Sequence, residues 1–130
     1  MSSNLENILK KINEYGNFRA SFISDDNGII AFACNNKNLN EDLIISLEKS
    51  LRDFTFKKIN LIGLSTIDTI KIRCKSDYII GKNIIIPKSE KQFLVGIITN
   101  VPQSGDIELY NEQALEILLK KIKPELRKLE

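Results

Sequence analysis

Residue types that could carry out chemistry are scarce in this sequence, and their spacing fits no catalytic arrangement. Histidine, which is the commonest general base and metal ligand, is absent. The two cysteines, Cys34 and Cys74, lack the C-x-x-C spacing and the accompanying histidines of a zinc site. Since no nucleophile with a base beside it can be identified, we predict that the chain is not an enzyme and binds no metal or cofactor.

The remaining polar candidates are better explained by structure than by catalysis. Asp25 and Asp26 could suggest a metal site, but acids beside Asn27-Gly28 are typical of a turn. An arginine finger acting on a GTPase is another possibility, yet no spacing supports it, and surface ion pairs explain the arginines better. The arginines considered are Arg19, Arg52 and Arg127. No stretch matches a Gly-rich phosphate-binding loop.

Charge and hydropathy restrict the class of protein further. The net charge of +2 is too small to favour nucleic acid as a partner. The N-terminal residues lack the apolar region of a signal peptide, and the longest apolar runs have the length of strands rather than of membrane spans. Two cysteines make no disulfide framework. We expect a single cytoplasmic domain over residues 1–130 that binds no nucleic acid and does not insert into a membrane.

Hydrophobic periodicity predicts the order helix, two strands, long helix, three strands, helix. The predicted helices cover residues 3–16, 38–62 and 106–123, and the strands cover 18–25, 29–34, 67–75, 78–86 and 93–98. Asn38 and Asp106 are the expected N-caps of the second and third helices. Pro124 is expected to end the last helix, which leaves a core of about residues 3–123 and a loosely attached tail over 124–130.

Three features of the predicted strands lead to specific structural expectations. Asn27-Gly28 predicts a hairpin with a type I′ turn. Gly81 indicates an irregularity in its strand, and Gly96 indicates the close approach of a helix to the apolar strand over 93–98. The strand from residue 67 alternates apolar residues with a basic row, which we interpret as a solvated face. The basic row consists of Lys71, Arg73 and Lys75.

The long helix has more apolar surface than one core needs. One predicted stripe, which we expect to cover the core, contains Leu43, Leu47, Leu51 and Phe54 with Ile44 and Leu61 alongside. A second stripe on the opposite side contains Ile45, Phe56 and Ile59, with Arg52 between them. Charged residues separate the two stripes, namely Glu48, Lys49 and Asp53. The second stripe predicts contact with another chain, although it could also pack beneath the chain's own connector.

The order of these elements and their local sequence resemble the Roadblock/dynein light-chain family, whose relatives are the longin domains. The likeness rests on the opening helix that leads into residues 18–24, the Asp-Asn-Gly-Ile-Ile turn, and the long helix that runs into Ile62-Gly63-Leu64. It continues through residues 67–74 and the apolar strand over 93–98, and spans about residues 5–122. The run Ile84-Ile85-Ile86-Pro87 and the basic row depart from the family pattern.

The resemblance implies an α+β fold with a five-stranded antiparallel sheet in the order 2-1-5-4-3. The long helix would lie on one face and the first and last helices on the other, with Cys34 and Cys74 at opposite edges. It also implies a homodimer, or a heterodimer with a homologous Roadblock-like chain, built by the long helix and the third strand. Carried over to this sequence, the interface residues are Ile45, Arg52, Phe56, Ile59, Ile70 and Ile72.

Such proteins bind Ras-like small GTPases and regulate or scaffold them, and single-domain versions are typical of bacteria and archaea. Two other classes fit a helix-flanked sheet of this length. A small-molecule sensor of the PAS or GAF type would need a sizeable apolar pocket with convergent polar groups, whereas this sequence fills its interior with Ile and Leu. A profilin-like actin-binding protein is the third candidate, and the absence of tryptophan makes it the weakest.

Overall fold

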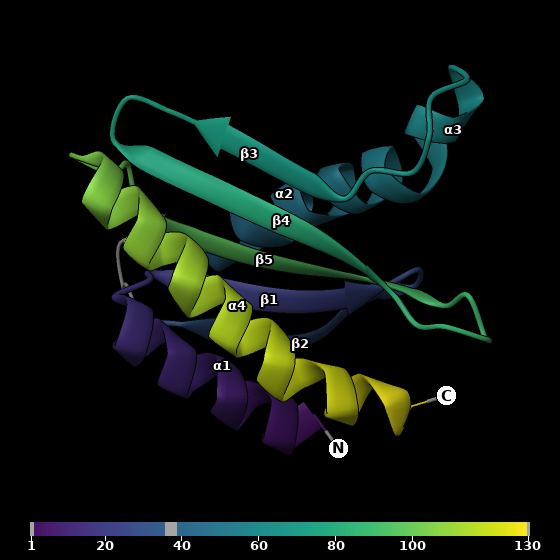
Figure 1. The fold of residues 1–130 in the computed structure, drawn as a ribbon, viewed down its shortest axis with the longest axis horizontal. Coiled ribbons are helices and arrows are strands. Elements are labelled where there is room, and N and C mark those ends of the chain that lie inside the picture. Colours follow the sequence, from purple (N-terminus) through teal and green to yellow (C-terminus); the bar gives the residue numbers. More distant parts are fainter. Residues whose placement is uncertain (1, 36–38, 130) are drawn as a thin grey trace.

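An antiparallel sheet forms the centre of the structure, and helices cover both of its faces (Figure 1). The computed structural model describes residues 2–35 and 39–129. The elements are α1 (Ser2–Gly16), β1 (Ala20–Asp25), β2 (Gly28–Cys34), α2 (Glu41–Asp53), η1 (Phe54–Lys58), α3 (Ile59–Leu61), β3 (Thr69–Arg73), β4 (Asp77–Ile85), β5 (Gln92–Asn100) and α4 (Gly105–Arg127). The strand order is β2-β1-β5-β4-β3, so the predicted fold class and sheet order are confirmed.

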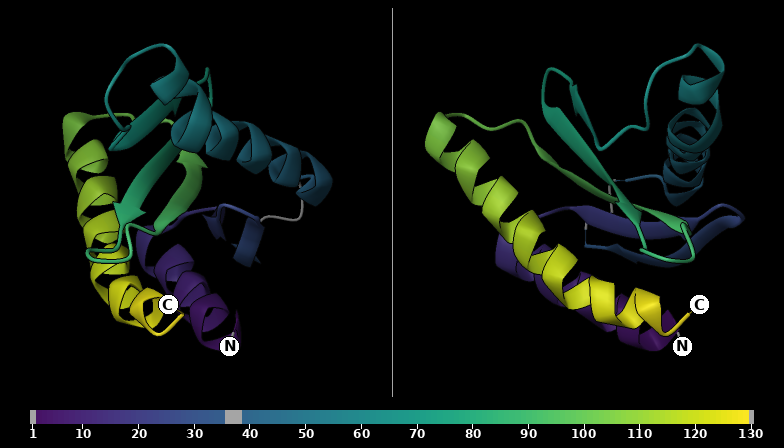
Figure 2. Two further views of the ribbon diagram at one scale, coloured as in Figure 1. Left: turned by 90° about the vertical axis from the view of Figure 1, so that its right-hand side faces the viewer. Right: turned by 45° about the vertical axis from the view of Figure 1, so that its right-hand side comes forward.

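The sheet separates two apolar clusters. Figure 2 shows α1 and α4 on one face and α2, η1 and α3 on the other. Neighbouring residues of a strand point to opposite faces, so Ile97 packs with α1 and α4, whereas Phe22 and Ile98 pack beneath α2. The central strand β5 is therefore buried on both sides, as predicted. The predicted core stripe of the last helix is also buried, and it consists of Leu115, Leu118, Leu119 and Ile122.

The β1–β2 hairpin is confirmed, but its predicted type I′ turn is wrong. That turn requires a positive φ at both central residues. Asp25 pairs with Gly28, and of the pair Asn27-Gly28 only Gly28 has a positive φ, at 143°. Instead, the N–H groups of Asn27 and Gly28 donate to Oδ1 of Asp25 over 2.8 and 3.2 Å. The carboxylate of Asp25 thus holds the turn, which agrees with a turn role for the acids at this position.

The two strand glycines behave differently from the predictions. Gly81 pairs with Gly96 in a continuous register between β4 and β5, so the predicted irregularity at Gly81 is wrong. The space beside Gly96 is occupied by a side chain of the neighbouring strand β1, and not by a helix. A Cβ at position 96 would overlap the ring of Phe22, with even Cε1 only 2.9 Å away. Gly96 therefore leaves the space that the fully buried Phe22 ring occupies.

Different residues from those predicted begin the second and third helices. Oδ1 of Asn40 accepts the N–H of Leu43 over 3.2 Å, so Asn40 is the N-cap of α2, and the predicted cap Asn38 lies outside the described residues. The N-cap of α4 is Ser104, whose hydroxyl accepts the N–H of Ile107 over 3.3 Å. Asp106 instead lies in the first turn of α4, where its negative charge suits the helix dipole.

The predicted end of the last helix at Pro124 is wrong. α4 continues to Arg127, and Leu126 is fully buried in the cluster between α1, α4 and the sheet. Pro124 itself is exposed, so water can solvate the carbonyl that its missing N–H leaves unpaired. Nδ2 of Asn4 on α1 donates to Oε1 of Glu125 over 2.9 Å. Residues 125–129 are thus packed against the domain, and Glu130 lies outside the described residues.

Candidate protein interface

The face that the long helix presents to the sheet differs from the predicted one. Ile44, Glu48, Leu51, Thr55 and Ile59 are buried along α2, η1 and α3. The spacing of the first four residues, 4, 3 and 4, is that of a regular α-helix. A π-helical turn over Phe54–Lys58 interrupts the regular winding, and in it the N–H of Ile59 donates to the carbonyl of Phe54 five residues earlier. Ile59 follows Thr55 by four residues and is also buried.

The predicted core stripe of this helix is therefore wrong in part. Leu43, Phe54 and Leu61 were expected to pack inward but are 67%, 43% and 83% exposed. Leu43 is exposed because the buried line runs through Ile44, one residue further along. After Phe54, the extra residue of the π turn sets back the helical phase by about 100°. As a result, Leu61 points outward.

The structure places the six predicted interface residues in different environments. Ile45 is half exposed on the outer side of α2. Phe56 is partly buried against the cluster beneath α2, as are Ile70 and Ile72 of β3, so these three residues share one cluster. Ile59 is only 7% exposed within the single chain, which leaves it little surface to offer a partner. A role of these residues in an interface stays a prediction.

Arg52, the sixth residue, forms an ion pair with a buried carboxylate. Its Nε lies 2.8 Å from Oε2 of Glu48, whose side chain is 1% exposed, and its Nη1 donates to the carbonyl of Asp26 over 3.2 Å. Glu48 was expected on the charged surface between the stripes, and this expectation is wrong. Since a buried carboxylate needs a positive partner, Arg52 has a structural task beside any contact with another chain.

A more exposed apolar surface lies where the long helix ends. Leu61, Ile62 and Leu64, here called the α3 surface, are at least half exposed, and Gly63 between them has a φ of 84°. Figure 1 shows α3 and the segment after it extending beyond the sheet at the β3 side. Periodicity predicts only a helix end and a connector here. The signal that could have revealed the α3 surface is the three large apolar residues crowded around a helix-ending glycine.

β3 and β2 form the two edges of the sheet. Cys34 lies on β2 and Cys74 directly follows β3, so the cysteines are at opposite edges, as the resemblance implies. Within the described residues β3 pairs with β4 alone, so the backbone groups of its outer side have no partner strand. Such an edge is a template for pairing with another chain. The α3 surface and this edge are therefore the candidate interface.

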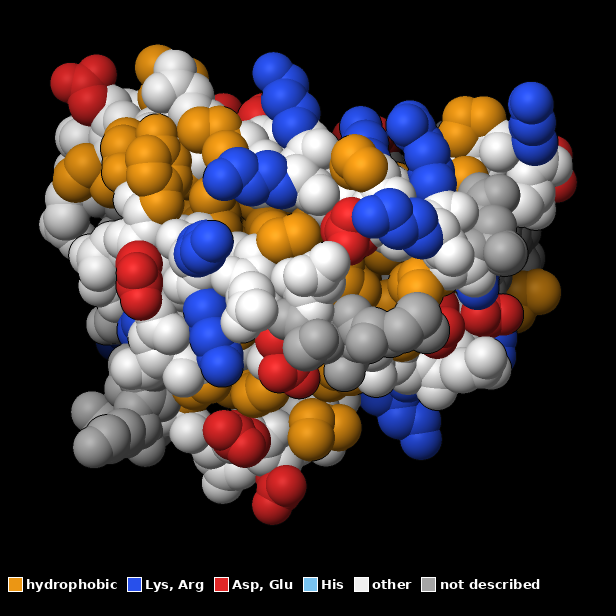
Figure 3. Space-filling model, turned by 90° about the horizontal axis from the view of Figure 1, so that it is seen from below, with side chains coloured by type: hydrophobic (Ala, Val, Ile, Leu, Met, Phe, Trp, Pro, Cys, Tyr) orange, Lys and Arg blue, Asp and Glu red, His pale blue; other side chains and the backbone are white. Residues whose placement is uncertain are grey.

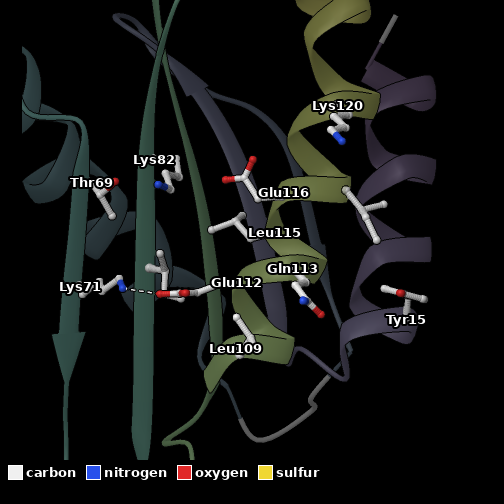
Figure 4. Close-up of a pocket in the computed structure, with 12 residues that line it drawn as sticks. Tyr15, Thr69, Lys71, Lys82, Leu109, Glu112, Gln113, Leu115, Glu116 and Lys120 are labelled. Carbon is white, nitrogen blue, oxygen red and sulfur yellow. Dashed lines mark hydrogen bonds and ion pairs between the residues drawn. The ribbon is translucent and has the colours of Figure 1, made fainter. Parts of the chain in front are cut away.

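The basic row of Lys71, Arg73 and Lys75 is exposed, as predicted, and two of its members also have partners on or just before α4. Nζ of Lys71 lies 2.6 Å from Oε1 of Glu112 on α4, and Figure 4 shows this ion pair crossing the groove between β3 and α4. Nη2 of Arg73 donates to the carbonyl of Pro102 over 3.3 Å. These contacts hold β3 to α4 and to the segment before α4, and leave the opposite side of the strand, with Ile70 and Ile72, toward α2.

Replacing Lys71 by methionine is expected to have a small, pH-dependent effect. The hydrogen bond to Glu112 raises the pKa of Lys71 above its ordinary value. Because the pKa is higher in the folded state, the protonated Lys71 stabilises the fold fully at pH values below the ordinary lysine pKa. This stabilisation is lost as the pH rises through the raised pKa. Because both side chains are exposed, the free energy of unfolding should fall by less than about 1 kcal/mol. Urea unfolding at neutral pH should show this difference, and a difference that persists unchanged at strongly alkaline pH would contradict it.

Metal-binding clusters and membrane-spanning helices are both absent from the described part of the chain. No group of three or more carboxylate or cysteine side chains is placed there to hold a metal ion. Among residues 2–35 and 39–129, no helix combines the length and the apolar character needed to cross a bilayer.

Comparison with known proteins identifies similar folds. No family model and no curated protein matches the sequence. MglB of Myxococcus xanthus is 19% identical over 95% of this chain and 90% of that chain, with a TM-score of 0.65. The gliding protein MglB of Thermus thermophilus is 12% identical over 95% and 91%, with a TM-score of 0.67. A Roadblock/LC7 domain from Streptomyces avermitilis is 9% identical over 95% and 98%, with a TM-score of 0.61.

Proposed function

Because the chain has the Roadblock/LC7 fold, we propose that it is a non-enzymatic, dimeric interaction module that binds a Ras-like small GTPase and regulates or scaffolds it. The observation that best supports this function is the α3 surface beside the unpaired edge of β3. Exposed apolar side chains are costly to leave in water, and an open strand edge invites pairing. The shortage of catalytic residue types in the sequence agrees with a role in binding.

The proposed dimer joins two copies of this chain, or this chain and a homologous one. A stable interface buries about 800 Å² on each partner. Exposed residues on the outer side of the long helix and on the connector can supply apolar area, and they are Leu43, Ile45, Phe54, Leu61, Ile62 and Leu64. Pairing of two β3 edges would add backbone hydrogen bonds. One of the similar solved structures, MglB in a tetrameric arrangement, supports self-association as a property of this fold.

Binding to a GTPase is tested with purified Ras-like GTPases of the source organism. Each GTPase is loaded with GDP or with a non-hydrolysable GTP analogue and titrated with this chain in a calorimeter. We expect at least one GTPase to bind in one nucleotide state more tightly than in the other. Failure of every such GTPase to bind in both states would overturn the proposed function while leaving the dimer intact.

Substituting aspartate for both Leu61 and Ile62 is expected to convert a dimer into a monomer. Light scattering should give the wild-type chain twice its mass of 14.8 kDa and the variant the single mass. Both side chains are exposed, so the variant should keep the circular dichroism of the wild-type chain. Ile45→Asp tests the predicted stripe in the same way.

The matched control for these variants is Leu109→Asp. Leu109 is 53% exposed on α4, on the opposite face of the sheet from α2, so this variant should remain a dimer. A wild-type chain that is monomeric at the concentrations of the assay, or a Leu61→Asp/Ile62→Asp variant that stays dimeric, would refute the proposed interface.

A further inference from the structure

A cavity of about 540 Å³ lies at the end of the sheet away from α3. Three segments that are distant in the sequence form it, and Figure 1 shows them converging at the left. They are the end of α1 with Gly16 and Asn17, the β3–β4 turn with Lys75 and Ser76, and the region from Thr99 to the first turns of α4. A backbone hydrogen bond from Val101 to Ser76, 3.0 Å long, ties two of these segments together. The volume is in the range of small-ligand sites.

Asn111 places an unused hydrogen-bond donor in the wall of this cavity. Its side chain is on α4 and is 4% exposed, and within the described residues Nδ2 has no hydrogen-bond partner. Leaving a buried amide donor unpaired destabilises a fold. Because Asn111 lines a cavity of ligand size, an acceptor that enters the cavity can satisfy Nδ2.

The charge around the cavity favours an anionic acceptor. Among the described residues that line it, Lys75 alone carries a charge. The N-terminal end of α4, a helix of 23 residues, adds the positive end of its dipole nearby. Carbonyls at the end of α1 are already occupied, since Tyr15 O accepts the hydroxyl of Tyr110 over 2.6 Å and Asn13 O accepts the N–H of Phe18 over 2.9 Å. The charge of Lys75 and the dipole of α4 therefore favour a negatively charged acceptor at this site.

One wall of the cavity is apolar. Ile107 and Tyr110 line it and are each nearly half exposed, and the ring of Tyr110 stacks on Tyr15 with 6.0 Å between the ring centroids. Figure 3 shows hydrophobic side chains gathered at the upper left, where α1 ends and α4 begins. A ligand that reaches Asn111 and Lys75 can thus place an apolar group against this wall.

We propose that this cavity binds a carboxylate attached to an apolar or aromatic group. The carboxylate accepts hydrogen bonds from Nδ2 of Asn111 and Nζ of Lys75, and the apolar group packs on Ile107 and Tyr110. A free organic acid and the C-terminal residue of a polypeptide share this chemistry. The proposal does not depend on the GTPase-binding function, because the α3 surface is at the other end of the sheet.

Nuclear magnetic resonance of the full-length ¹⁵N-labelled chain tests the proposal with four probes. N-acetylphenylalanine is compared with its amide, and a short peptide that ends in phenylalanine is compared with the same peptide amidated. Both acids should shift the side-chain NH₂ signals of Asn111 and the backbone signals of Lys75 and Ser76, whereas the amides should not. Tighter binding of the peptide acid identifies a polypeptide terminus as the source, and tighter binding of the small acid identifies a free organic acid.

Three variants complete the test. Asn111→Leu and Lys75→Gln should each weaken binding of the acids by about tenfold or more, and Lys120→Gln on the outer side of α4 should not. Asn111→Leu should also melt at a higher temperature than the wild-type chain, because leucine removes the unpaired amide. If Asn111→Leu does not fold, Lys75→Gln still tests the site. Any one of three results would overturn the proposal: equal shifts with acids and amides, no shift with any probe at about 1 mM, or unchanged affinity of both Asn111→Leu and Lys75→Gln.

Discussion

Replacing Arg52 by methionine is expected to lower the free energy of unfolding by about 3 kcal/mol. Methionine keeps much of the apolar stem of arginine but removes the guanidinium that pairs with Glu48 over 2.8 Å. The carboxylate of Glu48, whose side chain is 1% exposed, would then be buried without a positive partner. The hydrogen bond from Arg52 to the carbonyl of Asp26, which connects α2 to the β1–β2 turn, would be lost as well. Urea unfolding followed by circular dichroism measures the loss.

Two further variants separate the buried charge from the loss of contacts. The double variant Glu48→Leu/Arg52→Met removes both charges and should recover most of the stability, because a well-packed apolar pair can replace a buried ion pair. Lys58→Met breaks an exposed pair on the same long helix, where Nζ lies 3.4 Å from Oδ2 of Asp53, and should cost less than about 1 kcal/mol. If Arg52→Met is as mild as Lys58→Met, Glu48 does not depend on Arg52.

Gly96→Ala should destabilise the fold by about 3 kcal/mol, because the new Cβ would overlap a packed ring. The atoms concerned belong to Phe22, which is fully buried beneath α2 and pairs with Gly96 across β1 and β5. The ring cannot move aside without displacing the residues around it. The shift of the urea midpoint at unchanged slope measures the effect.

Gly81→Ala is the matched control, because Gly81 lies directly opposite Gly96 on β4. A Cβ at position 81 would be 3.4 Å from Cδ1 of Leu94, which is an ordinary contact distance, so the change should cost less than about 1 kcal/mol. The variant Gly96→Ala/Phe22→Leu tests the cause, since a smaller side chain at position 22 should make the alanine tolerable. Equal losses for Gly81→Ala and Gly96→Ala would refute this account of Gly96.

Much of the fold could be predicted from the sequence, because its signals are local and repeated. The Asn27-Gly28 hairpin, the apolar run of β5 and the stripe of α4 each follow from residue spacing within one element. The sheet order came from the resemblance to a known family, since spacing alone does not decide which strands pair. The turn type failed because Asp25 holds the turn with its carboxylate, which residue preferences at Asn27-Gly28 do not reveal.

The candidate interface was less predictable, because it depends on the phase of one helix. Periodicity groups Ile59 with Ile45, yet Ile45 is half exposed and Ile59 is buried. The π turn at Phe54–Lys58, which residue spacing does not reveal, changes the phase of the residues after it. Burial of Glu48 was also hidden, because a charged residue is normally assigned to the surface and its pairing with Arg52 is a tertiary property. The cavity beside Asn111 lies beyond sequence analysis altogether, since three segments distant in the sequence build it.

The extra residue within the long helix gives the domain a means of evolutionary change. Deleting one residue between Asp53 and Ile59 would restore ordinary winding without rotating the last helical turn, because losing a residue and losing the wide turn change its phase by about 100° in opposite directions. The part of the helix that holds Ile44 and Leu51 against the sheet would keep its place, and the side chains after the deletion would keep their direction. Descendants of one ancestral chain could thus gain or lose the wide turn through a single-codon change, without rebuilding their hydrophobic core.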